Sequence, residues 1–168
     1  MTPAGQRHRW ALLACASAQV RVTPVRERVL AILSRHAVPV TLAGIASDDE
    51  LANQFDDATV YRTLVLFMEL GVVRQLQFQG RQTHFILNVP GECFTFLICR
   101  CCGLIIRLPH GDLVQKLERE TAVVHGYTKL THELELFGTC PDCQKHEQAC
   151  QKPSKLSPGL RLRGRFRQ

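Results

Sequence analysis

The segment DDATVYRTLVLFMELG, residues 56–71, is typical of a capped amphipathic helix. Asp56 or Asp57 can cap its N-terminus, where unpaired backbone N–H groups favour a short acidic side chain. Gly71 follows the last turn, where a helix is expected to end. We expect one face to be buried, because a single apolar stripe runs along the helix at Val60, Leu64 and Phe67.

Four polar residues lie off this stripe within the first two turns: Thr59, Tyr61, Arg62 and Thr63. A DNA recognition helix reads base edges with its N-terminal residues, so contact groups are expected there. Arg62 can pair with a guanine edge or a phosphate, and Tyr61 can contact a thymine methyl group. The other interpretation is the solvated face of an ordinary surface helix.

Helical patterns precede this segment and strand patterns follow it. Thr23-Pro24 begins one helix, and Thr41 can cap another, short one. Two predicted strands, residues 72–78 and 83–87, flank the turn Gln79-Gly80-Arg81. Helices followed by a hairpin predict a winged helix-turn-helix, and Arg74 and Arg81 on the wing could reach phosphates.

The net charge of +6 is concentrated at the C-terminus. The segment 151–168 carries no acid and six basic residues: Lys152, Lys155, Arg161, Arg163, Arg165 and Arg167. The remainder of the chain is therefore about neutral. Nucleic-acid contact must therefore come from a local patch or from this tail. We expect the tail to be disordered and able to add non-specific affinity for phosphates.

The N-terminus has two interpretations. Arg7 and Arg9 precede the apolar run WALLACASA, which imitates a signal peptide. We favour a helix that packs Trp10, Leu13 and Ala14, and hence a cytoplasmic protein. No run approaches the roughly 20 apolar residues of a membrane span.

The pattern starts again at residue 92. Strands are predicted at 93–98 and 104–108, a helix at 112–125, and a last strand at 127–137. Alternate residues of the last strand share one face: Leu130, His132, Leu134 and Leu136. This half is small for a separate domain, and a sheet continued across a two-fold dimer would complete it. We predict a winged-helix domain at residues 1–88, a linker at 89–91 and an α/β domain at 92–150. Residues 151–168 form the tail.

Two CxxC pairs, Cys99/Cys102 and Cys140/Cys143, can supply four thiolates to one tetrahedral structural zinc ion. Disulfides are the alternative, and they are uncommon in cytosolic proteins. A redox-active CxxC is a further alternative, although one pair suffices for redox chemistry. The sequence shows no nucleophile–base pair and no phosphate-binding glycine loop, so we do not expect an enzyme.

These elements together resemble the ferric uptake regulator family of bacterial metal-responsive repressors. The matching motifs span roughly residues 20–145 in the family's order and include Thr23-Pro24-x-Arg26, Ala58-Thr59-Val60-Tyr61-Arg62-Thr63-Leu64, Leu97-Ile98-Cys99-x-x-Cys102-Gly103 and Leu134-Glu135-Leu136-x-Gly138-x-Cys140-x-x-Cys143. The resemblance implies an α+β fold with an N-terminal winged helix and a C-terminal α/β dimerisation domain. It also implies a homodimer on palindromic double-stranded DNA, with Tyr61 and Arg62 facing the DNA and a structural zinc on the four cysteines.

The chain departs from the family at the regulatory metal site. Of the usual ligand positions only His132 matches, and the others are occupied by Phe94, Phe96, Cys93, Pro39, Ile86, Arg107 and Val114. Either the sensory metal is lost and the apolar strand face of Phe94, Phe96 and Ile98 fixes the domain arrangement, or a second site is rebuilt. Candidates for a rebuilt site are Cys93, His132 and His84, with His110 and His125.

The leading interpretation is a dimeric DNA-binding transcription regulator, and a repressor is favoured. A thiol-based redox sensor using Cys101 or Cys93 is one alternative, because a low-pKa thiol near a zinc site is easily oxidised. A zinc-ribbon interaction protein that does not touch DNA is another.

Overall fold

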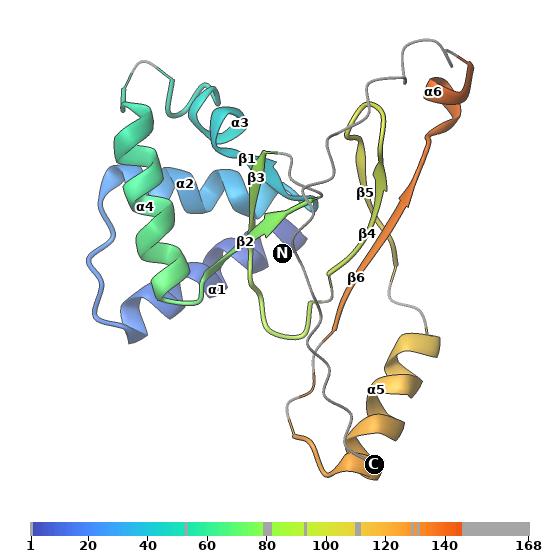
Figure 1. Ribbon diagram of the computed structural model, residues 1–168. Helices are drawn as coiled ribbons and strands as arrows, with labels where there is room; N and C mark the ends of the chain where they lie inside the picture. The colour runs from blue at the N-terminus through green and yellow to red at the C-terminus, as the bar shows by residue number, and fades with distance from the viewer. Residues whose placement is uncertain are drawn as a thin grey trace, which may run out of the picture.

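The computed structural model describes residues 2–52, 54–78, 82–92, 94–109, 112–128, 130 and 132–145 (Figure 1). Several residues singled out in the sequence lie outside these ranges: Arg81, Cys93, His110 and the tail 151–168. The described part contains a helical N-terminal half and a strand-rich C-terminal half, as predicted. None of the described helices is both long and apolar enough to cross a membrane.

The N-terminal half is a winged helix-turn-helix (Figure 1). Its helices are α1 (Pro3–Ser17), α2 (Pro24–Arg35), α3 (Leu42–Ala46) and α4 (Asp57–Glu69). Its sheet consists of β1 (Val40–Thr41), β2 (Val73–Gln77) and β3 (Thr83–Leu87), in the antiparallel order β1-β3-β2. The pairing of Gln75 with Phe85 sets the register of the wing hairpin.

Local sequence signals set the helix ends. The Thr41 hydroxyl accepts a hydrogen bond from the Gly44 N–H and caps α3, as predicted. Thr23 is the N-cap residue of α2, but its side chain makes no capping hydrogen bond. Gly71 follows α4 with φ of +68°, a left-handed conformation in which a Cβ would be strained.

The N-terminal core is formed by the apolar faces of the helices against the sheet, and includes Leu30, Leu33, Ile45, Leu64 and Phe67. The helix predicted at the N-terminus is α1, but its buried face differs from the prediction. Ala11 and Cys15 are fully buried, whereas Leu13 is 57% exposed. Trp10 and Ala14 are partly buried against the core, so the prediction was wrong for Leu13 alone.

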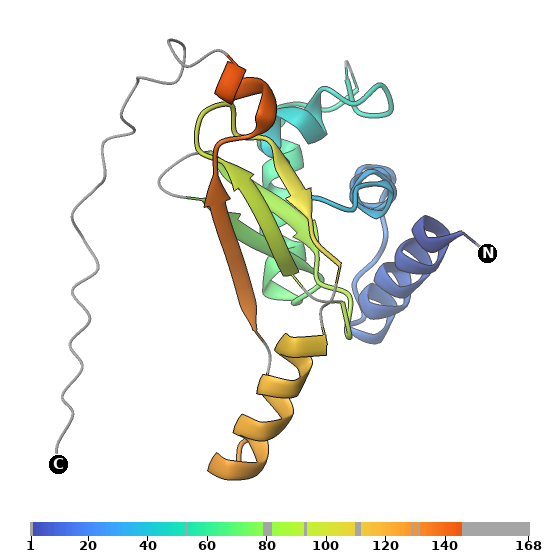
Figure 2. The same ribbon diagram turned by 90° about the vertical axis from the view of Figure 1, so that its right-hand side faces the viewer.

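The C-terminal half contains β4 (Phe94–Cys99), β5 (Ile105–Arg107), α5 (Asp112–His125), β6 (Glu133–Gly138) and α6 (Pro141–Lys145). Strand β4 lies at the centre of the sheet, antiparallel to β5 and parallel to β6. Helix α5 connects the two outer strands and extends away from the end of the sheet (Figure 2). The short helix α6, which begins inside the second CxxC pair, was not predicted.

The last strand is shorter than predicted. It starts at Glu133, so Leu130 and His132 precede it and do not share its face with Leu134 and Leu136. The helix predicted at 112–125 agrees with α5.

The two halves are joined by a second, separate apolar cluster. Leu76, Phe78 and Ile86 of the wing region are buried with three residues of β4: Phe94, Phe96 and Ile98. The prediction that these β4 residues form one apolar face is confirmed.

Candidate nucleic-acid interface and metal centre

The N-terminus of α4 is fixed by Asp56. Its carboxylate accepts a hydrogen bond from the Thr59 N–H at 2.6 Å. Hydrogen bonds from the side chain and from the backbone of Thr59 lower the pKa of Asp56, and nearby Arg62 lowers it further. Of the two predicted caps, Asp56 is therefore the residue that orients the first turn.

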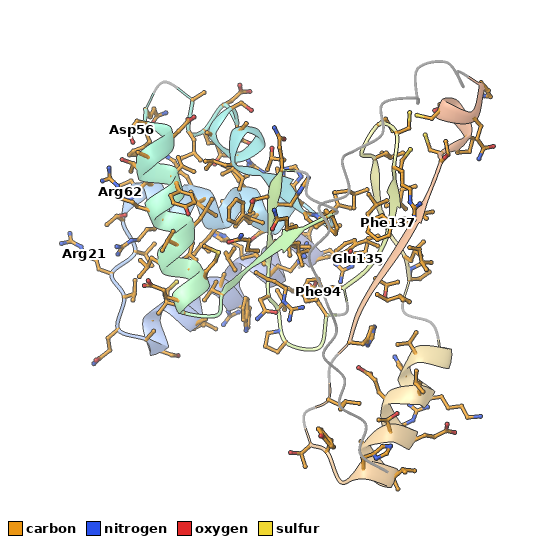
Figure 3. The ribbon with its side chains drawn as sticks, in the orientation of Figure 1. Arg21, Asp56, Arg62, Phe94, Glu135 and Phe137 are labelled. Carbon is orange, nitrogen blue, oxygen red and sulfur yellow. The ribbon has the colours of Figure 1, made fainter. Side chains whose placement is uncertain are left out.

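The two faces of α4 differ sharply in exposure. Val60, Leu64 and Phe67 are fully buried, whereas Tyr61 is 48% exposed and Arg62 is exposed. Figure 3 shows Arg62 at the edge of the molecule that faces away from the C-terminal half. A phenol and a guanidinium on the open N-terminal half of a rigid helix are suited to contacts with base edges and phosphates.

Thr63 does not belong to this exposed row. It is only 6% exposed, and its hydroxyl donates to the Thr59 carbonyl at 2.9 Å. The prediction that it lies on the open face is therefore wrong, because Thr63 follows Val60 by three residues and precedes Phe67 by four, which places it on the buried side of α4. Thr59 itself is half-buried.

Arg21 was not predicted as a site residue, yet it lies on the same side of the molecule as Arg62 in Figure 3. It is exposed in the loop before α2 and points away from the C-terminal half (Figure 3). The Arg26 guanidinium donates to the Arg21 carbonyl at 2.7 Å and holds this loop against α2. Sequence periodicity does not mark loop residues, and the tertiary arrangement reveals Arg21.

Of the two wing arginines predicted to reach phosphates, only Arg74 lies within the described residues. Arg74 stacks on the Phe94 ring, with its Cζ 4.9 Å from the ring centroid. Its guanidinium thus faces the C-terminal half, which corrects the prediction that Arg74 is directed to phosphates. Arg81 lies outside the described residues and remains a prediction.

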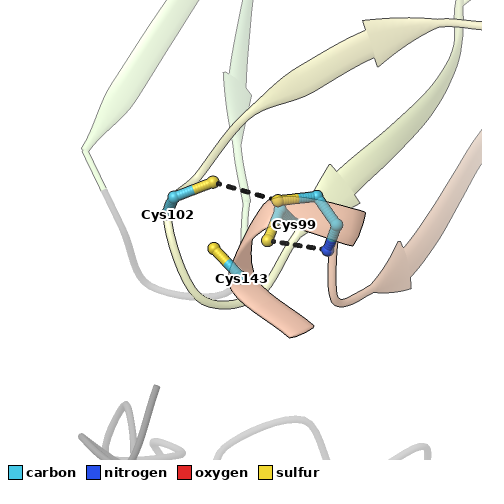
Figure 4. Close-up of side chains that lie close together, drawn as sticks. Cys99, Cys102 and Cys143 are labelled. Carbon is cyan, nitrogen blue, oxygen red and sulfur yellow. Dashed lines mark hydrogen bonds between the residues drawn. The ribbon is translucent and has the colours of Figure 1, made fainter. Parts of the chain in front are cut away.

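The four CxxC cysteines converge at the tip of the C-terminal sheet. Cys99 ends β4, Cys102 follows in the β4–β5 turn, and Cys140 and Cys143 lie at the start of α6. Their sulfur atoms all lie within 4.8 Å of one another. Figure 4 shows the sulfur atoms facing a common centre. Cys101 is half-buried beside this group and is not part of it.

This geometry fits a tetrahedral zinc ion. Four sulfurs at about 2.3 Å from zinc lie about 3.8 Å apart, and Cys102 Sγ is 3.8 Å from Cys140 Sγ. The Cys140 N–H donates to Cys99 Sγ at 3.3 Å. Burial raises the pKa of Cys99, but hydrogen bonds from the backbone N–H groups of the two turns outweigh burial and lower it to about 6. Cys99 thereby favours the thiolate, the form that binds zinc, whereas hydrogen bonds with the neighbouring thiols raise the pKa of Cys143.

The predicted second metal site is not assembled among the described residues. His132 Nδ1 lies 2.7 Å from Glu118 Oε1, and both line a cavity of about 590 Å³ at the linker. His84 lines a different cavity of about 400 Å³ beside Phe78 and Cys102. The structure therefore does not bring His84 and His132 together, and Cys93 lies outside the described residues. Within those residues, the cysteine group is the only cluster of three or more candidate ligands.

Comparison with known proteins agrees with this architecture. The model of the ferric uptake regulator family matches residues 17–137. A ferric uptake regulation protein of Synechococcus elongatus is 30% identical over 128 residues, which cover 74% of this chain and 86% of that protein. The peroxide-responsive repressor PerR of Staphylococcus aureus is 27% identical over 128 residues, 76% of this chain and 84% of that protein.

The crystal structure of the Vibrio cholerae ferric uptake regulator superposes with a TM-score of 0.63 at 26% identity, covering 76% of this chain and 98% of that one. The Helicobacter pylori regulator, at 17% identity and a TM-score of 0.64, shares the fold. With the family model matching most of its length, this chain belongs to the ferric uptake regulator family.

Proposed function

We propose that this protein is a cytoplasmic, dimeric, sequence-specific DNA-binding transcription regulator, and a repressor, that reads the major groove with α4. The observation that carries this proposal is the capped N-terminal half of α4, which presents Tyr61 and Arg62 while its other face is buried. A solved structure of the same fold, at 24% identity and a TM-score of 0.54, is of a zinc uptake regulator complexed with zinc and DNA.

A homodimer is supported by an apolar row on the outer face of the C-terminal sheet. Ile106, Leu97 and Leu136 are aligned across the three strands, and the two outer residues are 45% and 44% exposed. Leu117 and Val123 of α5 are also exposed, and β6 is an edge strand. A second copy of this chain would cover this apolar surface, and its symmetry would match a palindromic operator.

We propose a structural role for zinc at Cys99, Cys102, Cys140 and Cys143. The ion would join the β4–β5 turn to the beginning of α6 and so close the tip of the C-terminal sheet. A fully thiolate-bound zinc leaves no open coordination position, and its contribution is to stability of the fold rather than to chemistry.

The test is selection of DNA from a random duplex pool by the zinc-loaded protein, followed by affinity measurements on the enriched sequence. Arg62→Ala and Tyr61→Ala should each weaken binding by roughly 10- to 100-fold, the usual value of a base or phosphate contact in a recognition helix. Arg119→Ala, which removes an exposed charge from α5, is the matched control and should leave affinity within about twofold.

Failure of the wild-type protein to enrich any sequence would contradict the proposal and favour a zinc-dependent interaction protein. Unchanged affinity in Arg62→Ala and Tyr61→Ala together would move the DNA-reading surface away from α4.

A further inference from the structure

The junction between the two halves is held by direct side-chain contacts. We infer that an Arg7–Glu92–Arg107 charge triad, together with the aromatic contact of the wing with β4, positions α4 relative to the C-terminal domain without a metal ion at the junction. The inference rests on the proposed function, because it concerns how the recognition helices of the dimer are spaced.

The triad links three parts of the chain. Arg7 of α1 is only 8% exposed; its Nε lies 2.9 Å from Glu92 Oε1, and its Nη2 donates to Oε2 at 3.0 Å. Arg107 of β5 donates from Nη1 to the same Oε2 at 2.9 Å. The Glu92 carboxylate, between β3 and β4, is therefore bridged by one arginine from each half.

Arg7 also ties the triad to the winged-helix core. Its Nη1 donates to the carbonyl of His36, the C-cap residue of α2, at 2.8 Å. A movement of the C-terminal domain about the linker would separate Glu92 from at least one guanidinium. Each charged hydrogen bond lost in a half-buried site costs more than a neutral one, so the triad opposes such movement.

The aromatic contact acts at a second point. The Phe78 ring packs against Phe96 with centroids 6.0 Å apart, and Phe96 lies 6.3 Å from Phe94. Arg74 of β2 stacks on the Phe94 ring from the winged-helix side, with its Cζ 4.9 Å from the ring centroid. Two separate contact points, one ionic and one apolar, restrict rotation about a linker far more than either does alone.

The residues at this junction do not fit a divalent cation. Glu92 lines the same cavity as Glu118 and His132, but Glu118 and His132 are hydrogen-bonded to each other, and two guanidinium groups already neutralise Glu92. Among the described residues these side chains do not form a group of three candidate ligands. A cation beside Glu92 would be repelled by both arginines. The strand that runs through the junction presents Phe94 and Phe96, whose rings offer no ligand atom. Binding of DNA should then not depend on addition of a second metal.

The experiment compares small-angle X-ray scattering of the full-length, zinc-loaded protein with and without added Mn²⁺, and repeats both for Glu92→Gln. Glutamine keeps the shape of Glu92 and removes its charge. The matched control is Glu50→Gln, which removes an ion pair between Glu50 and Arg35 that lies wholly within the winged-helix domain. Affinity for the selected duplex is measured on the same samples.

We expect wild-type scattering and affinity to be the same with and without Mn²⁺. Glu92→Gln should broaden the distance distribution and weaken DNA binding about tenfold, whereas Glu50→Gln should change neither. Arg107→Gln should behave like Glu92→Gln, and Arg107→Lys, which retains the charge, should recover part of the loss.

A Mn²⁺-induced change in wild-type scattering would overturn the inference, as would a Glu92→Gln profile identical to that of wild type. Absence of DNA binding by the wild-type protein would instead contradict the proposed function. The scattering comparison would still confirm or overturn the positioning role, because it does not require DNA.

Discussion

Phe78, directly after β2, and Phe96, in β4, pack edge to face with ring centroids 6.0 Å apart and an interplanar angle of 78°. This is the preferred arrangement of two aromatic rings, and both side chains are 1% exposed. Their contact joins the wing to the C-terminal sheet in one apolar cluster. The stability of the two halves should therefore be coupled.

Phe96→Ala should lower the free energy of unfolding by about 3–5 kcal/mol, because it removes a fully buried ring and leaves a cavity between the two sheets. Urea denaturation of the zinc-loaded protein measures this loss. Leu13→Ala on the exposed side of α1 is the control and should cost within about 0.5 kcal/mol. A loss below about 1 kcal/mol in Phe96→Ala would show that the junction is not closely packed in solution.

Cys140→Ser should abolish zinc binding, because a serine hydroxyl is not deprotonated near neutral pH and leaves three thiolates. Native mass spectrometry should show one zinc ion per chain in the wild-type protein and no zinc in Cys140→Ser. Cys101→Ser changes a neighbouring thiol outside the four-sulfur group and should keep the ion. Loss of zinc from Cys101→Ser and its retention in Cys140→Ser would contradict the assignment of ligands.

Thr63→Val should leave DNA affinity within about twofold, since the Thr63 hydroxyl is buried and donates to the Thr59 carbonyl within α4. Valine has nearly the same shape, so helix packing is preserved. Affinity for the selected duplex, compared with Arg62→Ala, checks the expectation. A loss in Thr63→Val as large as that in Arg62→Ala would place Thr63 at the DNA.

His84 should make stability depend on pH. Burial lowers the pKa of His84. Its ring packs against the Phe78 ring, and its Nδ1 atom is buried without a hydrogen-bond partner. The folded state therefore binds this proton less readily than the unfolded state. The contribution of neutral His84 is fully present above about pH 6.5 and is lost as pH falls through the lower pKa of the folded state.

The measurement is the difference in unfolding free energy between the wild type and His84→Leu from about pH 8 to about pH 5. Taking the difference removes the contribution of other titrating groups, provided that zinc content is constant. As pH falls, the free energy of unfolding of the wild type should decrease relative to that of His84→Leu. A difference independent of pH would contradict the burial of a neutral His84.

Local signals in the sequence were sufficient for the elements that carry the proposed function. The Asp56 cap, the Val60–Leu64–Phe67 stripe and Gly71 predict α4 because helix caps and periodicity act within a few residues. The paired CxxC turns predict the four-sulfur group because each turn brings two thiols together by itself. Residues placed by local geometry are thus predictable from the chain alone.

The tertiary structure decided what each exposed candidate contacts. Arg74 stacks on Phe94, and Arg7 reaches Glu92 across 85 residues of sequence. Thr63 is buried and Leu13 is exposed, because packing decides which sides of α4 and α1 face the core. The sequence by itself determined the helices, the wing and the cysteine site. Only the fold determined which residues this apolar face and Glu92 contact at the junction, because contacts between residues far apart in the chain depend on how the two halves pack.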